Sequence, residues 1–301
     1  MKVYDCFSFW HEFLALEIRL EELYEIVDYF VIIESKYTHT GEIKSFYLKE
    51  NLHKFAKYAD KIILVNDVNF YKNHNAIERG NYQRSLIDNE LDKLFLHNDD
   101  LIIISDSDEI PKRNVIENLK LQPRNVIIEI STYSHFINLY FHEWPRIRVL
   151  QYKDFRGVQK EFRETFINTA LDQKRYKCNP FLRINPWFSA SKFDTKVGAW
   201  VGFNRKKISV IKDGGWHFTK IYDTETLIKK IKYSGHTEFN TAEVNRESII
   251  SDLKNKTIPY GKKYVGKIHE IDDSFPFAIR KNTSKFKDYI YIDHSDNGKN
   301  L

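Results

Sequence analysis

The sequence has 301 residues, of which 42% are hydrophobic and 15% aromatic. That is enough apolar material for one large core, with or without a smaller lobe. The net charge of +5 is mild and does not require nucleic acid or a membrane as partner. Cys6 and Cys178 show no CxxC spacing, which excludes a zinc ribbon or a disulfide framework and favours a reduced, intracellular protein.

No stretch approaches the ~20 apolar residues that cross a bilayer. The N-terminal residues MKVYDCFSFW also lack the features of a signal peptide. From the sequence we therefore expect a cytoplasmic protein without a transmembrane segment.

Strand-like and helix-like segments alternate in the first half. Apolar runs predict strands at residues 3–9, 29–34, 61–66 and 101–105. Helical spacing of apolar residues predicts helices around Leu16–Val27, Leu52–Ala59 and Ile87–Leu94. Apolar runs that alternate with amphipathic helices are typical of an α/β fold with a mostly parallel central sheet covered on both faces.

The second half is less regular. Val126–Ile130 predicts a strand, and residues 224–233 predict a Lys-rich helix. Residues 131–205 are rich in aromatics and Arg, and their strand order cannot be read. We expect the tail from residue 259 to wrap the surface. No repeat or linker is evident, which favours a single domain over 1–301.

Ligands of such sheets bind beyond the carboxyl ends of the strands. The polar segments that follow the apolar runs are therefore the candidate ligand-binding segments. They are Asp5–Ser8, Glu34–Thr40, Asn66–Asp67 and Asp106–Glu109.

The strongest local signal is the Asp-Ser-Asp motif at Asp106 and Asp108, which follows an apolar strand and precedes Glu-Ile-Pro. Two alternating carboxylates can bind Mg²⁺ or Mn²⁺ and leave positions open for substrate phosphates. Such an ion neutralises charge on a departing diphosphate. The alternative is an acidic turn in which Asp or Ser caps the following helix.

Three further signals point to ligand contacts. His217, after the pair Gly214-Gly215, can offer an imidazole to the same ion, or can be a buried core histidine. Glu34, at a strand end, can accept hydrogen bonds from a base or ribose, or can lie in a solvated loop. Arg84, in the helix before the acidic motif, can pair with phosphate or form a surface salt bridge.

Candidates for the general base are Asp213, His236 and Glu238, each of which can also be a solvated polar residue. Trp144, Trp187 and Trp200 can stack on sugar rings, although buried core aromatics are commoner.

Together these segments resemble glycosyltransferase family 17. The resemblance covers much of residues 4–240, with a weaker likeness at 276–290. The matching segments are YDCFSFWHE (4–12), EIRLEELYEIVDYFVIIES (17–35), ADKIILV (59–65), ERGNYQR (78–84), DDLIIISDSDEIP (99–111), GGWHF (214–218) and SGHTEFN (234–240).

The resemblance implies a GT-A-type fold, a UDP-sugar donor (N-acetylglucosamine as the sugar), a divalent cation (Mn²⁺ or Mg²⁺) and an inverting reaction on a glycan acceptor. Residues 1–125 would then form the nucleotide-sugar half and 126–301 the acceptor half. Asp106 and Asp108 match the family's DxD motif, and His217 its Gly-Trp-His motif. We assign Asp106, Asp108 and His217 to the cation, and Phe7, Glu34, Arg84 and Asp106 to the donor.

The sequence departs from the animal members because it lacks their N-terminal anchor and aligns only loosely over 140–205. A soluble bacterial or viral enzyme that builds a surface glycan fits these departures.

Two other classes of protein stay open. One is a haloacid-dehalogenase-type phosphohydrolase, whose DxD normally closes the first strand. The other is a non-catalytic glycan-binding module on a transferase scaffold.

Overall fold

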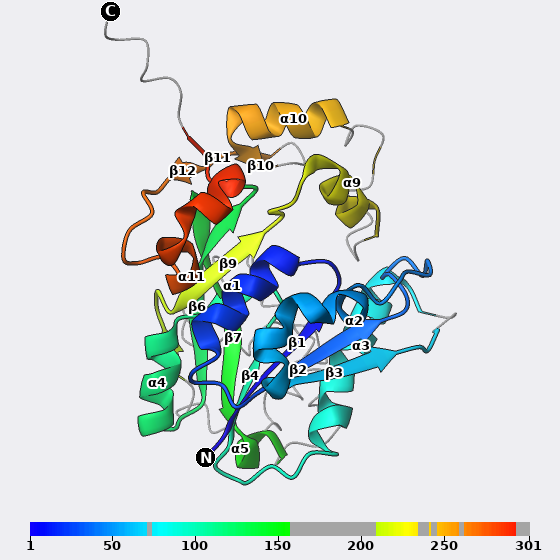
Figure 1. The fold of residues 1–301 in the computed structure, drawn as a ribbon, viewed down its shortest axis with the longest axis vertical. Coiled ribbons are helices and arrows are strands. Elements are labelled where there is room, and N and C mark those ends of the chain that lie inside the picture. The colour runs from blue at the N-terminus through cyan, green and yellow to red at the C-terminus, as the bar shows by residue number, and fades with distance from the viewer. Residues whose placement is uncertain (71–73, 157–208, 234–240, 242–245, 259–261, 293–301) are drawn as a thin grey trace, which may run out of the picture.

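The computed structural model describes residues 1–70, 74–156, 209–233, 241, 246–258 and 262–292. Within these residues a central sheet is covered by helices on both faces, with α9 and α10 placed beyond one end of it (Figure 1). None of the described helices is long and apolar enough to cross a membrane.

The strands of the main sheet are β1 (Val3–Phe9), β2 (Tyr29–Ser35), β3 (Ile62–Asp67), β4 (Leu101–Ile104), β5 (Glu109–Pro111), β6 (Val126–Ser134), β7 (Leu139–Gln151), β8 (Ser209–Ile211), β9 (Gly215–Thr219) and β12 (Lys267–Ile268). The helices are α1 (Phe13–Leu23), α2 (Tyr47–Asn51), the 3₁₀ helix η1 (Leu52–Lys61), α3 (Ala76–Leu91), α4 (Arg113–Leu121), α5 (Tyr152–Arg156), α9 (Thr224–Tyr233), α10 (Arg246–Asn255), α11 (Phe277–Lys281) and the 3₁₀ helix η4 (Thr283–Tyr289). A separate hairpin pairs β10 (Thr257–Ile258) with β11 (Lys262–Val265).

The first four strands form a parallel sheet in the order β3-β2-β1-β4. The apolar runs of β1, β2 and β4 are buried on both faces, as parallel strands between helices require, whereas that of the edge strand β3 is half-buried. All four carboxyl ends therefore lie at one edge, where the predicted ligand-binding segments follow. The α/β class and the mostly parallel first half are confirmed.

Beyond β4 the sheet becomes mixed. β7 pairs antiparallel with both β4 and β6, and β9 runs parallel to β6 and antiparallel to β5. The second half of the chain thus extends the same sheet. This order places the short β5, which follows the acidic motif, against the Gly-Trp-His strand β9.

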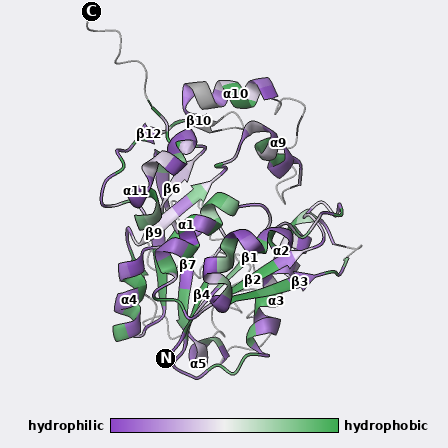
Figure 2. Cartoon of the chain, viewed as in Figure 1, coloured by the Kyte–Doolittle hydropathy of each residue, from purple (hydrophilic) through white to green (hydrophobic). Residues whose placement is uncertain are grey.

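The helices cover the two sheet faces with separate apolar clusters. Leu16 and Leu20 of α1 pack on one face together with Phe55 of η1 and Ile116 of α4. On the other face α3 and α5 pack against alternate residues of the same strands. Figure 2 shows β1 to β4 as largely hydrophobic, whereas the helices carry both hydrophobic and hydrophilic residues.

Some predicted elements differ from the structure. The segment Asp5–Ser8 does not follow β1 but lies inside it, because β1 continues to Phe9. Leu52–Ala59 is a 3₁₀ helix rather than an α-helix, and α3 ends before Leu94. The acidic turn does not cap the next helix, since α4 has Lys112 at its N-cap with no side-chain cap.

The glycine pair before Trp216 has a packing role. A Cβ on Gly215 would lie 2.4 Å from the carbonyl oxygen of Ile110 and 2.8 Å from Ile130 Cγ2. A Cβ on Gly214 would lie 2.4 Å from Ile128 Cγ2. Glycine therefore lets β9 approach β5 and β6 closely enough to pair with both.

We expect Gly215→Ala to destabilise the fold by roughly 1–3 kcal/mol, because the added methyl meets backbone that cannot rotate away. Urea unfolding measures the loss. Lys212→Ala, an exposed change in the preceding turn, is the control and should stay within about 0.5 kcal/mol of wild type. Equal stability of the two variants would show that the close approach is not needed.

Candidate active site

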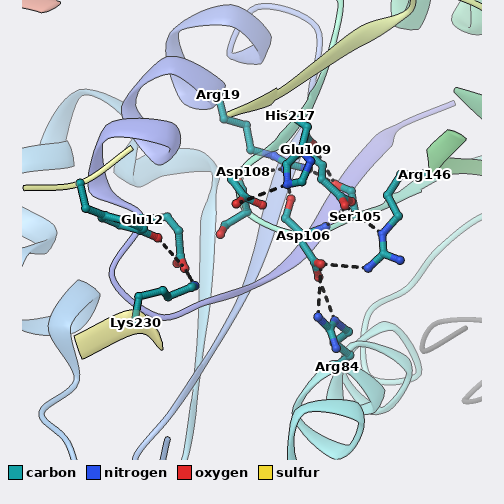
Figure 3. A network of polar contacts seen from close by, with 12 residues as sticks. Glu12, Arg19, Arg84, Ser105, Asp106, Asp108, Glu109, Arg146, His217 and Lys230 are labelled. Carbon is teal, nitrogen blue, oxygen red and sulfur yellow. Dashed lines mark hydrogen bonds and ion pairs between the residues drawn. The ribbon is translucent and has the colours of Figure 1, made fainter. Parts of the chain in front are cut away.

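The acidic motif lies at the carboxyl edge of the parallel sheet, in the turn between β4 and β5 (Figure 3). Two backbone hydrogen bonds hold the turn. The N–H of Glu109 donates to the carbonyl of Asp106, and the N–H of Phe218 on β9 donates to the carbonyl of Asp108. The second bond fixes the turn against the Gly-Trp-His strand.

A buried arginine holds this turn from beneath. Arg19 of α1 is 0% exposed and forms a two-point pair with Asp5 of β1, at 2.7 and 2.5 Å. Its remaining N–H groups donate to the carbonyls of Asp106 and Glu109, both at 2.9 Å, and to Ser105 Oγ at 2.8 Å. The backbone of the motif is therefore set by a charge in the core.

The Asp106 carboxylate is held by two arginines. Arg84 Nε of α3 lies 2.8 Å from one oxygen, while Arg84 Nη2 and Arg146 Nη2 lie 3.2 and 3.0 Å from the other. Burial alone would raise the pKa of Asp106, but the two guanidinium groups outweigh it and hold that pKa well below its usual range. Asp106 is thus a fixed anion that positions Arg84 and Arg146.

Glu109 completes this charged group. Its carboxylate accepts from Arg146 Nε at 2.8 Å and from the Asp106 backbone N–H at 2.9 Å. Burial raises the pKa of Glu109, and the adjacent Asp106 adds to this, while Arg146 opposes it. Both carboxylate oxygens of Glu109 are occupied within the protein, so its role here is to orient Arg146.

Asp108 and His217 form a different kind of pair. His217 Nε2 lies 3.6 Å from Asp108 Oδ2, which is too long for a hydrogen bond. Burial lowers the pKa of His217, but the Asp108 carboxylate outweighs it and the net shift is upward. His217 Nδ1 is buried and has no hydrogen-bond partner.

These features fit two ligands of one cation. Two ligand atoms at the usual ~2.1 Å from one ion lie roughly 3–3.5 Å apart, close to the Asp108–His217 separation. No three His, Cys, Asp or Glu side chains gather around a point anywhere in the described part of the chain. The remaining ligands would have to be substrate phosphates or water, as is usual for Mg²⁺.

A second polar cluster lies beside this pair. Lys230 of α9 contacts the Glu12 carboxylate in the turn after β1, and Tyr222 OH donates to the same carboxylate at 3.2 Å (Figure 3). Trp144 of β7 also lies near the pair, with its ring centroid 6.2 Å from that of His217.

The structure thus brings Arg84, Asp106, Asp108 and His217 together, but not Phe7 or Glu34. Phe7 is fully buried in the core, with the Arg19 guanidinium 4.2 Å from its ring. Glu34 is also fully buried and accepts from the backbone N–H groups that open α2. Burial raises its pKa, which Lys44 and these N–H groups oppose.

Of the base candidates, Asp213 is the one that the structure describes. Its side chain is 76% exposed and pairs with Lys112 at 2.9 Å, four residues before His217 along the chain. His236, Glu238, Trp187 and Trp200 lie outside the described residues. The roles of all three base candidates stay predictions.

Sequence reasoning missed several residues of the site, namely Glu12, Arg19, Arg146, Tyr222 and Lys230. Arg19 stands between two apolar residues of α1, and this position was a signal of burial. Arg146 lies in the segment whose strands could not be read. Lys230 is one of several lysines of α9, and nothing in the local pattern sets it apart.

The fold and the site define an α/β protein of the GT-A type with an acidic, arginine-held motif at the carboxyl edge of its sheet. The model of glycosyltransferase family 17 matches residues 1–183. The chain belongs to this family.

Curated relatives match over a shorter range. The rat β-1,4-mannosyl-glycoprotein 4-β-N-acetylglucosaminyltransferase is 31% identical over 133 residues, which is 40% of this chain and 23% of that protein. Its human counterpart is 32% identical over 124 residues, or 37% and 22%. The match thus spans about a quarter of the length of these relatives.

Among solved structures, the mannosyltransferase PcManGT from Pyrobaculum calidifontis, in complex with GDP-Man and Mn²⁺, is 11% identical. The alignment covers 77% of this chain and 61% of that chain, with a TM-score of 0.36. A TM-score this low supports no inference about ligand or reaction.

We expect Arg19→Met to destabilise the protein by about 3–5 kcal/mol, because it leaves Asp5 as an uncompensated buried charge. Urea unfolding measures the change. The matched control is Arg113→Met, which breaks the exposed pair with Glu117 on α4 and should cost less than about 1 kcal/mol. A small effect of Arg19→Met would mean that the motif does not depend on the buried pair.

Proposed function

We propose that this chain is a glycosyltransferase that moves a sugar from a nucleoside diphosphate donor to a hydroxyl of a glycan acceptor. The observation that carries the proposal is the Asp108–His217 pair at the carboxyl edge of the sheet, in which His217 Nε2 lies 3.6 Å from Asp108 Oδ2, close to the spacing of two ligands on one ion. Family membership supports the same class of reaction. The names of the mammalian relatives favour N-acetylglucosamine as the sugar and hence a UDP-sugar as donor.

Asp108 and His217 would hold the divalent cation, Mn²⁺ or Mg²⁺. When bound, such an ion offsets the negative charge that grows on a departing diphosphate. Asp106 is not free to act in the same way, since both its oxygens accept from Arg84 and Arg146. We therefore assign it to positioning rather than to direct coordination.

Arg84 and Arg146 carry positive charge beside the place where the diphosphate would lie. Arg146 Nη1 is buried and has no hydrogen-bond partner, while its other nitrogens are fixed by Asp106 and Glu109. A hydrogen-bond donor that is already oriented in the free protein can stabilise the charge that develops during the reaction without first having to reorganise. We propose that these guanidinium groups bind the nucleotide portion of the donor.

The reaction is proposed to be a single displacement. The acceptor oxygen forms a bond to the anomeric carbon while the bond to the diphosphate oxygen breaks, and the diphosphate leaves with the electron pair. The acceptor proton passes to a base, for which Asp213, His236 and Glu238 remain the candidates. Attack from the face opposite the nucleotide converts an α-linked donor into a β-linked product.

We expect Asp108→Asn to lower UDP-sugar turnover at least ~100-fold, because it removes a charged ligand from the site where leaving-group charge is offset. UDP release in the presence of Mn²⁺ is the measurement, with circular dichroism to check the fold. Asp99→Asn is the matched control: it lies in the same segment, but its side chain is 71% exposed and pairs only with Lys153 among the described residues.

Three results would contradict the proposal. One is full metal-dependent turnover by Asp108→Asn. Another is release of inorganic phosphate from a phosphomonoester in place of UDP, which would indicate a phosphohydrolase. The third is tight glycan binding by wild type with no nucleotide or metal dependence, which would indicate a binding module.

A further inference from the structure

Lys230 places a positive charge from the second half of the chain beside Asp108. It lies on α9, and its ammonium contacts the Glu12 carboxylate in the turn between β1 and α1. A neighbouring residue of α9, Lys232, lies 3.7 Å from Glu42, which follows β2. Two contacts thus hold α9 over the carboxyl edge of the sheet, where the site is.

Glu12 is fully occupied by this arrangement. One oxygen accepts from the backbone N–H groups of Trp10 and His11 at 2.8 and 3.0 Å, and the other contacts Lys230 and Tyr222. Burial alone would raise the pKa of Glu12, but Lys230 and these N–H groups lower it to about 2. Glu12 is thus a permanent anion and a poor base, suited to holding a cation in place.

The Lys230 ammonium contacts Glu12 and lies within electrostatic range of the acidic motif. Burial lowers its pKa, but Glu12 first, and Asp108 and Asp106 further away, outweigh this and keep it charged. An ammonium has three N–H donors, and within the described residues Glu12 is its one acceptor. The side chain remains 32% exposed, so two donors can meet a ligand.

The other charged groups of the site are likewise paired, although Arg146 Nη1 has no hydrogen-bond partner. Arg84 and Arg146 are fixed by Asp106 and Glu109, which leaves Asp108 with His217. A diphosphate brings two or more negative charges to this place. Lys230 is the described cation on the side of Asp108 that lies opposite the arginines (Figure 3).

We propose that Lys230 binds the diphosphate of the donor, on the β-phosphate that departs with the nucleotide, and that Glu12 is its positioning residue. The inference rests on the proposed function above. A structural alternative exists, in which the Glu12–Lys230 pair only ties α9 to the N-terminal half.

The test compares nucleotides with and without a β-phosphate. UDP and UMP are titrated calorimetrically into wild type and Lys230→Met in the presence of Mn²⁺, with GDP/GMP and CDP/CMP in parallel. Losing a charge-assisted hydrogen bond should weaken diphosphate binding about 10- to 100-fold. Monophosphate affinity should change less than about twofold, because the proposal places Lys230 on the β-phosphate, which a monophosphate lacks.

Two further variants separate phosphate binding from a structural tie. Lys230→Met leaves Glu12 buried without its cation, so Glu12→Gln/Lys230→Met should restore stability but not diphosphate affinity. Lys229→Met is the matched control, since Lys229 is exposed on the same helix, and it should bind all nucleotides as wild type does. Lys230→Arg keeps the charge and should retain most of the diphosphate affinity.

The outcomes are distinct. Wild-type binding of diphosphate by Lys230→Met, equal losses for UDP and UMP, or recovery of affinity in the double variant would overturn the role of Lys230 alone. If wild type binds none of the three nucleoside diphosphates, the proposed function fails and this inference fails with it.

Discussion

The buried pair between Arg19 and Asp5 is the interaction on which the site depends. A guanidinium in the core is tolerated only when its hydrogen bonds are satisfied. Here the partners are a carboxylate of β1 and the backbone carbonyls of the acidic motif. Satisfying this one charge requires α1, β1 and the turn after β4 to meet in a single arrangement.

The rest of the site consists of acidic and basic side chains that alternate around that turn. Asp106 and Glu109 share Arg146, and Asp106 also holds Arg84. Each of these charges thus has a partner, which offsets the cost of desolvating it. Two buried nitrogens of the site lack a hydrogen-bond partner, namely Arg146 Nη1 and His217 Nδ1. The two residues of the DxD motif therefore differ in their partners: Asp106 accepts from two arginines, whereas Asp108 lies beside His217.

The first half of the fold could be predicted because β1, β2 and β4 are buried on both faces, and all four strands, with the half-buried β3, appear in the sequence as continuous apolar runs. β7 could not, since Pro145 and several charged residues interrupt its pattern and its burial varies along 13 residues. Arg146 was missed for the same reason. Asp106, Asp108, His217 and Arg84 were found from motifs, whereas Phe7 and Glu34 belong to the core and to a helix N-terminus.

Lys230 could not be predicted from the sequence for a different reason. Its importance comes from contact with Glu12, more than 200 residues away in the sequence, and no local pattern encodes such a pairing. The same contact explains how the less regular second half takes part in the site. α9 has little apolar burial of its own, with Leu227 and Ile231 packed mainly on Ile249 of α10. The buried Glu12 carboxylate links this small helical unit to the N-terminal half, and under the proposal the Lys230 ammonium that makes this link is also the charge that a phosphate would meet.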